Sequence, residues 1–317
     1  MTAGEPRVLA IVNPAAGGDP ETLLAALREA VRDSLGVAYT QGPGDAERLA
    51  SEYAAAAQSR PEDCLVVSIG GDGTAREVAS GLYRTAGARS GGGQPAMVIA
   101  PGGTGNSNYR SIWDDRPWTE VLAVVTGGSL PVRTIDLAVT QSDDIVLLGA
   151  GAGVIAEALV LVPLSRSSGR EKLAEAMFRT LAEYKPVGCR VAVDGTVLIE
   201  ADIMLVNIGG GKYRGGGFNL LPGSVLDDGL LDVCVTTAGA NPAELVRLAV
   251  AGRLEGHPAM HYGRGRQVTV ERIDAQPLLY EHDGDVMPAE RSDFTVTVLP
   301  AALRMVVPHA MPDSLQV

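Results

Sequence analysis

The sequence predicts two domains: an α/β domain with a parallel sheet, followed by a β-rich antiparallel domain that forms a sandwich. The chain has 317 residues, which is more than one compact core usually contains. Its first third alternates short apolar runs with amphipathic stretches, as parallel sheets covered by helices do. After about Pro131, strand-like runs follow one another closely. We therefore expect the first domain at residues 1–132, with a C-terminal return at 301–317, and the second at 133–300.

The elements of the first domain follow from apolar periodicity and turn residues. Asp19 and Pro20 supply a cap and a first turn for a helix that we expect to end at Gly36. Two more helices are expected over Asp45–Gln58 and Thr74–Tyr83. The expected strands are Val8–Val12, Val37–Thr40, Cys64–Ile69 and Ala96–Ala100.

The second domain combines many strands with two helices, Lys172–Tyr184 and Ala243–Ala251. The segment Ile145–Leu164 is long and apolar enough to span a membrane. Its glycines, however, fall where a strand would turn into a helix, so we expect a buried strand–loop–helix. The expected strands are Thr134–Thr140, Ile145–Leu148, Arg190–Val193, Val197–Asn207, Leu230–Thr236, Gln267–Glu271, Leu278–His282 and Phe294–Leu299.

Composition limits the partners of the protein. The formal net charge of −12 argues against a general nucleic-acid binder and against permanent docking on anionic lipid. The three cysteines are few and far apart, which favours a reducing cytosol over a disulfide framework. We expect a cytoplasmic protein with at most peripheral contact at the inner membrane surface, and a homodimer stays an open alternative.

Three glycine-rich loops follow three successive strands of the first domain. Their sequences are NPAAGG from Asn13, GGDGT from Gly70 and PGGTGN from Pro101. In a parallel sheet such loops meet at the carboxyl edge, where glycine lets backbone N–H groups approach phosphate oxygens. One such loop alone would be only a tight turn, but three in register predict a phosphate site. Asp72 adds a carboxylate suited to Mg²⁺, and the absence of a G-x-x-x-x-G-K-[ST] motif excludes a P-loop enzyme.

A further glycine pattern, Gly151-Ala152-Gly153-Val154-Ile155-Ala156, fits the dinucleotide motif G-x-G-x-x-A. It lies outside the βαβ region, and the acidic residue at a suitable distance, Glu171, precedes a helix instead of ending a strand. We therefore assign it no nucleotide.

With these loops, the sequence resembles the diacylglycerol kinase catalytic-domain family, which includes bacterial lipid kinases and sphingosine and ceramide kinases. The resemblance runs from Val12 to Pro308. It rests on VNPAAGG, AYTQGPGDAERLA, GGDGTAREVASGL and PGGTGNSNYR in the first half. In the second half, VNIGGGKYRGGGFNLLPGSVLDDGLLDVCV, HDGD and LPAALRMVVP resemble later family segments. The resemblance implies a NAD-kinase-like nucleotide-binding domain and a kinase that phosphorylates a lipid hydroxyl with ATP and Mg²⁺.

The resemblance also implies a role for individual residues. Asp283 would be the general base, with the acceptor in the cleft between the domains; Asp-Gly is also a common turn pair, and both roles are compatible. Asp72 and Asp136 would support catalytic Mg²⁺, while Asp228 and the carbonyls of Val225 and Leu230 would hold a structural Mg²⁺. The nucleotide set comprises Asn13, Pro14, Gly17, Gly18, Thr40, Gly70, Gly71, Asp72, Gly73, Thr74, Glu77, Gly103, Thr104, Gly105, Asn106 and Asp285.

Three departures from the family pattern leave the substrate open. Ser107 stands where the family usually has Asp, Asp285 replaces a Glu, and Ile155 occupies a position that normally carries Asp. The main expectation is a kinase of diacylglycerol or a related long-chain alcohol. The alternatives are a same-fold kinase of a soluble alcohol, NAD-like acceptors included, and a nucleotide-binding regulator without catalysis.

Overall fold

The computed structural model describes residues 7–57, 64–86, 94–165, 169–214, 217–239 and 241–309. The chain divides into two compact units, Met1–Asp136 with Ala301–Val317, and Leu137–Pro300. Two strands, β5 (Val132–Thr140) and β17 (Asp293–Val306), contribute residues to both units. The domain border expected at 132/133 falls at the first residue of β5.

The first unit is built on a parallel sheet in the order β2-β1-β3-β4, to which the end of β17 is added through Met305 and Met97. All six residues of β3 are buried, as expected for a central strand covered on both faces. The strands are β1 (Val8–Val12), β2 (Leu35–Tyr39), β3 (Leu65–Gly70) and β4 (Ala96–Pro101).

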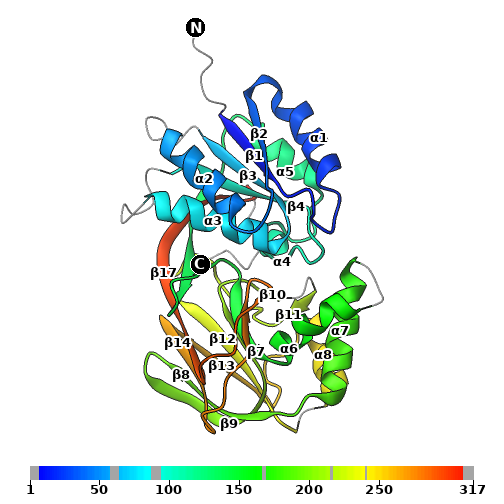
Figure 1. The fold of residues 1–317 in the computed structure, drawn as a ribbon, viewed down its shortest axis with the longest axis vertical. Helices are drawn as coiled ribbons and strands as arrows, with labels where there is room; N and C mark the ends of the chain where they lie inside the picture. The colour runs from blue at the N-terminus through cyan, green and yellow to red at the C-terminus, as the bar shows by residue number, and fades with distance from the viewer. Residues whose placement is uncertain are drawn as a thin grey trace. The chain divides into compact units, whose positions relative to one another are not determined.

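Helices cover both faces of this sheet. The chain moves from β1 outward to β2 and then back past β1 to β3, so right-handed crossovers place α1 and α2 on opposite faces. Figure 1 shows α2 and α3 on one side of the sheet and α1 and α5 on the other. Helix α2 contacts α3, and α1 contacts α5. Because β1, β3 and β4 are parallel, the loops that follow them lie at one edge of the sheet. The direction of winding reverses beside β1, and in such sheets this is where ligands bind. The helices are α1 (Pro20–Val31), α2 (Asp45–Ala56), α3 (Asp72–Ala86), α4 (Ser107–Trp113) and α5 (Trp118–Val125).

The second unit is mainly antiparallel, in the order β16-β15-β7-β9-β8-β14-β17. The long strand β9 pairs first with β8 and then with β7, and its other edge pairs with β12. The strands are β6 (Ile145–Val146), β7 (Gly149–Gly153), β8 (Val187–Val193), β9 (Thr196–Gly209), β10 (Tyr213–Arg214), β11 (Phe218–Asn219), β12 (Leu231–Thr237), β13 (Met260–Gly265), β14 (Gln267–Arg272), β15 (Tyr280–His282) and β16 (Asp285–Val286).

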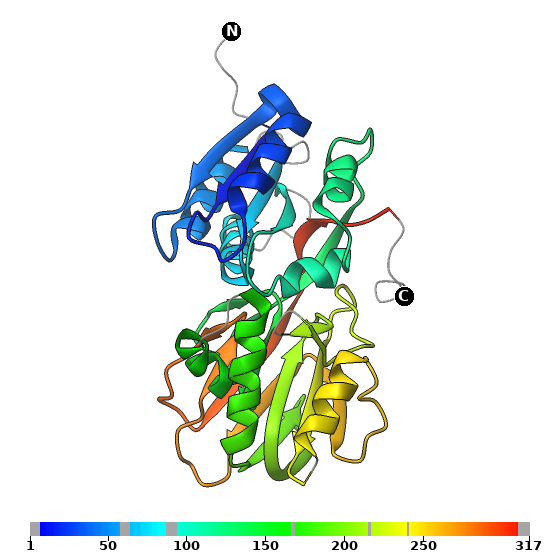
Figure 2. The ribbon, with the colours of Figure 1, turned by 90° about the vertical axis from the view of Figure 1, so that its right-hand side faces the viewer.

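Two apolar clusters stabilise the second unit. One lies among the strands and includes a stacked ring pair, Tyr280 and Phe294, with centroids 4.6 Å apart. The other lies beneath three helices and includes Ile155, which is 7% exposed. Figure 2 shows α7 (green) and α8 (yellow) running alongside the strands of this unit. The helices are α6 (Val154–Leu161), α7 (Gly169–Glu183) and α8 (Pro242–Val250).

Several sequence-based expectations of local structure are wrong. The first helix ends at Val31, because Arg32 has a φ of 51° and starts a short 3-10 turn; Gly36 lies inside β2. The glycine segment after Leu148 is a strand, β7, and not a loop. A Cβ at Gly153 would lie 2.3 Å from the carbonyl oxygen of Met204, so glycine permits the close pairing with β9. Helices α4 and α5 and strand β13 were not among the elements expected from the sequence.

The segment Ile145–Leu164 forms two short strands, α6 and a 3-10 turn. Across the described ranges we find no helix that combines the length and the apolar character needed to cross a membrane. Two residues between its short strands, Leu147 and Leu148, contribute backbone amides to the site described below.

Candidate active site

The three glycine-rich loops of the first unit contact one another directly. The Gly18 amide donates to the Gly102 carbonyl at 3.1 Å. A Cβ on Gly103 would lie 2.4 Å from Cα of Gly71, and a Cβ on Gly17 would also collide with the third loop. Glycine at these positions lets the backbones of the loops approach each other closely. The structure therefore brings together the loops that the sequence predicts as a phosphate site.

Polar side chains fix the shape of these loops. Nδ2 of the Asn13 side chain donates to Oγ1 of Thr74 at 3.1 Å, which ties the first loop to the second. Asn106 has a φ of 54°, and its side chain accepts from the Gly103 amide at 2.8 Å and donates to the Pro101 carbonyl at 3.2 Å. This closes the third loop upon itself. Pro14, Thr104 and Gly105 lie in the same loops, and Gly73 lies in the first turn of α3.

Asp72 connects the second loop to the third. Its carboxylate accepts from the amides of Ser107 at 3.1 Å and Asn108 at 2.9 Å, so it caps the first turn of α4. Among the described residues no three His, Cys, Asp or Glu side chains form a metal cage. A single carboxylate fits Mg²⁺, which is usually held by one or two carboxylates together with substrate phosphates and water.

Two other predicted residues have contacts within the first unit that stabilise the fold. Both oxygens of Glu77 accept backbone amides at the start of α2, from Gly44 at 2.9 Å and Ala46 at 3.1 Å. Thr40 donates its amide to the carbonyl of Val12 at 2.9 Å. Glu77 therefore orders the segment that follows Thr40, and contact of either residue with a nucleotide stays a prediction.

Asp136 lies where β5 meets the returning chain. Its Oδ1 accepts from the amide of Ala301 at 2.7 Å, and Ala301 has a φ of 48°. The contact stabilises an unfavourable backbone conformation at the start of the C-terminal return. A role of Asp136 in Mg²⁺ binding stays a prediction.

Asp283 is the central side chain of the second unit. It is 2% exposed, has a φ of 51° and forms a turn with Gly284. Its Oδ2 accepts from the Leu147 amide at 3.0 Å and its Oδ1 from the Leu148 amide at 2.5 Å. Nδ1 of the buried His282 lies 3.7 Å from Oδ2. The carboxylate is therefore held in one orientation by backbone that is distant in sequence.

Sequence reasoning missed two charged residues next to this turn. Arg214 and Glu281 are 3% and 1% exposed and form an ion pair. Burial raises the pKa of Glu281, and the Arg214 guanidinium opposes this shift. An arginine inside a glycine-rich run and a glutamate inside an apolar strand were visible in the sequence, and either could have indicated a buried pair. Asp285, in contrast, is exposed on β16.

The predicted structural metal site of the second unit is lined by cationic charge. Asp228 Oδ1 accepts from the Leu230 amide at 2.9 Å, and its Oδ2 contacts the guanidinium of Arg264. Arg264 Nε also lies 3.5 Å from Oδ1 of Asp232, whose pKa burial raises to about 6. Because Arg264 already neutralises these carboxylates, the donor set of Asp228, Val225 and Leu230 does not fit a metal well. Mg²⁺ at this position stays a prediction.

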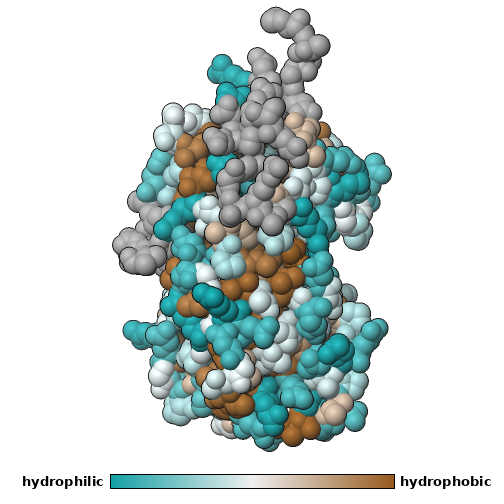
Figure 3. Space-filling model, turned by 90° about the vertical axis from the view of Figure 1, so that its left-hand side faces the viewer, coloured by the Kyte–Doolittle hydropathy of each residue, from teal (hydrophilic) through white to brown (hydrophobic). Residues whose placement is uncertain are grey.

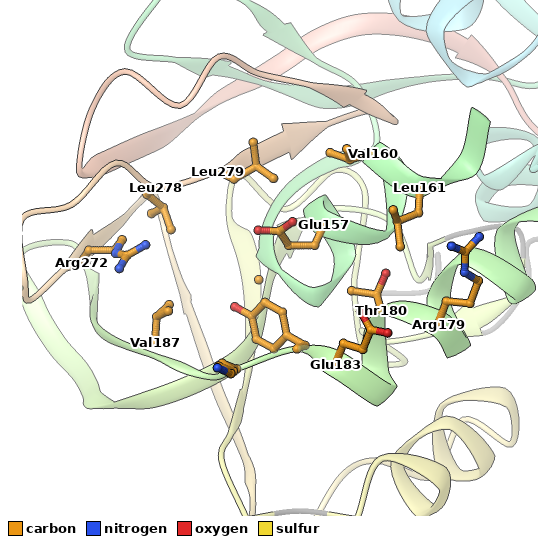
Figure 4. A pocket seen from close by; sticks show the side chains of 13 residues that line it. Glu157, Val160, Leu161, Arg179, Thr180, Glu183, Val187, Arg272, Leu278 and Leu279 are labelled. Atoms are coloured by element: carbon orange, nitrogen blue, oxygen red, sulfur yellow. The ribbon is translucent and has the colours of Figure 1, made fainter. Parts of the chain in front are cut away.

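A pocket of about 460 Å³ opens in the second unit between α6, α7 and the neighbouring strands. In Figure 4 the side chain of Glu157 lies in the middle of the view, with Arg179 and Arg272 at opposite ends. One part of the lining is aliphatic and the other is charged, so the pocket suits an amphipathic molecule. The lining comprises Gly153, Glu157, Val160, Leu161, Arg179, Thr180, Glu183, Tyr184, Lys185, Val187, Arg272, Leu278 and Leu279.

Comparison with known proteins identifies the class to which this fold and these loops belong. The sequence model of the diacylglycerol kinase catalytic domain matches residues 7–137. The model of the YegS C-terminal NAD kinase beta sandwich-like domain matches residues 149–307. The chain therefore belongs to the diacylglycerol kinase family of lipid-kinase-like enzymes, with a second domain of the YegS type.

Individual relatives cover nearly the full chain. A protein of Pseudomonas putida named "Probable lipid kinase YegS-like" is 30% identical over 292 residues, which is 89% of each chain. A "Diacylglycerol kinase" of Mycobacterium tuberculosis is 28% identical over 325 residues and covers 98% of this chain and 99% of its own. The crystal structure of a diacylglycerol kinase from Bacillus anthracis has a TM-score of 0.70 at 23% identity, over 98% and 100% of the chains. The similarity to the Bacillus anthracis structure shows a shared fold.

Proposed function

We propose that this protein is an ATP- and Mg²⁺-dependent kinase that transfers the γ-phosphoryl group to a hydroxyl of a lipid such as diacylglycerol. The observation that carries the proposal is the contact of three glycine-rich loops at one edge of the parallel sheet. Backbone N–H groups concentrated there, with the N-terminus of α3 beside them, favour the phosphate groups of a nucleotide. The names of the relatives support the choice of a lipid acceptor.

Each loop would have its own part in nucleotide binding. Asn13 and Thr74 hold two of the loops in register, and Asn106 keeps the third loop closed. Asp72 would face the cation that accompanies the nucleotide. When bound, ATP with Mg²⁺ supplies the phosphoryl group and neutralises part of its charge.

Asp283 would accept the proton of the acceptor hydroxyl. In the transfer the O–H bond of the acceptor breaks and its oxygen bonds to the γ-phosphorus, while the bond from that phosphorus to the bridging oxygen of ADP breaks. The proton goes to a carboxylate oxygen of Asp283, which the Leu147 and Leu148 amides hold in place. The proposal requires the phosphate held by the first unit to meet this carboxylate during the reaction.

The pocket beside α6 and α7 would take the rest of the acceptor. Its aliphatic wall suits an acyl chain, and its charged rim suits a head group or a lipid surface. The protein would then meet a lipid acceptor by peripheral contact with a membrane. A soluble alcohol acceptor remains the second candidate, because an apolar residue, Ile155, stands buried on α6 at a position where the family usually has a carboxylate.

The test is transfer of the labelled γ-phosphate of ATP to diacylglycerol and sphingoid bases in mixed micelles, beside glycerol, nucleosides and NAD. We expect a phosphorylated lipid only when Mg²⁺ is present. Exclusive labelling of a soluble alcohol would refute the lipid acceptor, and ATP binding without transfer to any acceptor would refute the kinase.

The assignment of Asp283 has a closely matched control. Asp194 also begins an Asp-Gly turn, has a φ of 48° and accepts two backbone amides, from Arg266 and Gln267, both at 2.9 Å. Asp194 is exposed, whereas Asp283 is buried. Asp283→Asn should lower kcat at least about 100-fold with unchanged ATP affinity, and Asp194→Asn should not. Equal turnover of the two variants would remove Asp283 from the mechanism.

A further inference from the structure

Two buried charges of the second unit have no part in the chemistry proposed above. Arg214 lies on the two-residue strand β10, and Glu281 lies on β15, two residues before Asp283. Burying an ion pair is costly, and replacement of such pairs by apolar residues of similar volume is often neutral or stabilising. Stability alone is therefore a weak explanation for the pair, so its contacts indicate what else it does.

The pair is bonded to both sides of the Asp283–Gly284 turn. Nη2 of Arg214 contacts Oε1 of Glu281, and its Nη1 donates to the Gly149 carbonyl at 3.1 Å. The same carbonyl accepts the Asp283 amide at 3.0 Å. Oε2 of Glu281 accepts the Gly284 amide at 3.1 Å. One guanidinium and one carboxylate therefore hold the backbone before and after the Asp283 side chain.

Strand β7 makes room for this pair. Gly151 is paired with Glu281 in the sheet register, and a Cβ on Gly151 would lie 3.0 Å from Oε1 of Glu281 and 2.9 Å from the Val206 carbonyl oxygen. Any other residue at this position would displace the carboxylate. The glycine pattern that fits a dinucleotide motif thus has a different explanation, since it lets a buried glutamate approach the strand.

The conformation of Asp283 needs such support. Its φ of 51° is uncommon for a residue other than glycine, and contacts with the surroundings stabilise it. The Leu147 and Leu148 amides hold the carboxylate, while Arg214 and Glu281 hold the backbone that carries it.

We propose that Arg214 and Glu281 form a positioning pair that aims the carboxylate of Asp283 at the acceptor hydroxyl. The inference rests on the proposed kinase function and adds two residues that act through Asp283 without touching the substrate. Since a misplacement of about 1 Å can cost about 100-fold in rate, loss of the pair lowers kcat. It leaves the affinity for ATP unchanged, because the nucleotide loops belong to the other unit.

The test compares two double variants of the full chain. Arg214→Leu/Glu281→Leu removes the buried pair and leaves no unpaired charge. Arg190→Leu/Glu200→Leu removes an exposed pair of the same unit, in which Nε and Oε2 are 2.8 Å apart. We expect the first variant to lose about 100-fold in kcat, with its acceptor KM, ATP affinity and melting temperature close to those of the control variant. A kcat equal to that of the control would overturn the proposal, as would loss of ATP binding by a folded variant.

A second variant keeps the inference testable if the double variant does not fold. Arg214→Lys retains a positive charge for Glu281 but cannot also reach the Gly149 carbonyl with a rigid fork. We expect an unchanged melting temperature and a kcat about 10-fold lower. The pH–rate profile is recorded as well, because Arg214, Glu281 and His282 are the charged and titratable groups facing Asp283. A shifted profile would support positioning of the base, and an unshifted profile at wild-type kcat would refute it.

The wild-type protein is assayed first with the acceptor panel, so that failure of the proposed kinase function can be distinguished from failure of the positioning role of Arg214 and Glu281. A wild-type protein that phosphorylates no acceptor would refute the kinase and the inference with it. An active wild type together with a fully active pair variant would refute the inference alone.

Discussion

A single added methyl group should test whether contact between the glycine loops forms the nucleotide site. In Gly103→Ala the new Cβ would lie 2.4 Å from Cα of Gly71, while ordinary contact begins near 3.4 Å. The Cβ of residue 103 is fixed to the backbone and the Cα of Gly71 is part of it, so neither atom can rotate away. The two loops must therefore separate by about 1 Å. Overpacking of this kind costs about 1–3 kcal/mol. For a domain of this size, that lowers Tm by about 2–4 °C for each kcal/mol.

The same separation should weaken nucleotide binding. Backbone amides from two loops can bond one phosphate only at a fixed spacing, so we expect the Kd for ATP to rise at least about 10-fold, or about 1.4 kcal/mol. Titration calorimetry with ATP and Mg²⁺ measures this, and thermal unfolding measures the first effect. Gly128→Ala is the control, because a Cβ there meets no atom within 4 Å and the residue is exposed. If both variants bind ATP and melt alike, the loops are ordinary turns and the reasoning fails.

Three further predictions concern other parts of the chain. Asn13→Ala should weaken ATP binding about 10-fold in calorimetry, because the bond to Thr74 that joins two loops is lost; unchanged affinity would contradict this. Burial raises the pKa of Cys189 to about 11 and of Cys234 to about 12, so almost no thiolate exists at pH 8. Both should resist Ellman's reagent until the protein unfolds, and rapid labelling of the native protein would disprove their burial. Without nucleotide, EDTA should leave the Tm of the wild type unchanged, whereas Arg264→Ala should become stabilised by Mg²⁺, because Arg264 contacts Asp228; an EDTA effect that Asp228→Asn abolishes would contradict this.

The parallel sheet of the first unit could be predicted because its strands are short, mostly apolar runs that are separated by amphipathic helical stretches. Strands Val8–Val12 and Ala96–Pro101 agree with the expected ranges to within one residue. The positions of the glycine loops follow from this sheet, since parallel strands place their carboxyl ends together. The glycine loops could therefore be placed from local sequence patterns alone.

The contacts of the acidic side chains could not be predicted in the same way. Asp72 and Glu77 lie on one helix in a motif expected to bind nucleotide and metal, yet each accepts two backbone amides from a different segment. These bonds cap helices α4 and α2, whose cap residues, Asn106 and Gly44, make no capping bond of their own. A helix start without a local cap is therefore a sign that a distant carboxylate supplies one.

The surface gives no such guidance to function. On the face shown in Figure 3, hydrophobic residues are interspersed with hydrophilic ones. The exposed apolar side chains Val160, Leu164 and Phe178 lie on or beside α6 and α7, near the proposed acceptor pocket. Single exposed apolar residues are normal on soluble domains, so peripheral membrane contact has to be tested by transfer to micellar lipid and not inferred from hydropathy.

Two Asp-Gly turns of the second unit, at Asp194 and Asp283, show why a motif alone does not define a site. Asp194 and Asp283 share the same dipeptide and nearly the same φ, and each accepts two backbone amides. They differ in what lies around them. Asp194 is exposed between two strands, whereas Asp283 is enclosed by the Leu147–Gly149 backbone and by the ion pair of Arg214 and Glu281. Because those groups come from three separate segments, only the fold can distinguish the buried Asp-Gly turn from the exposed one.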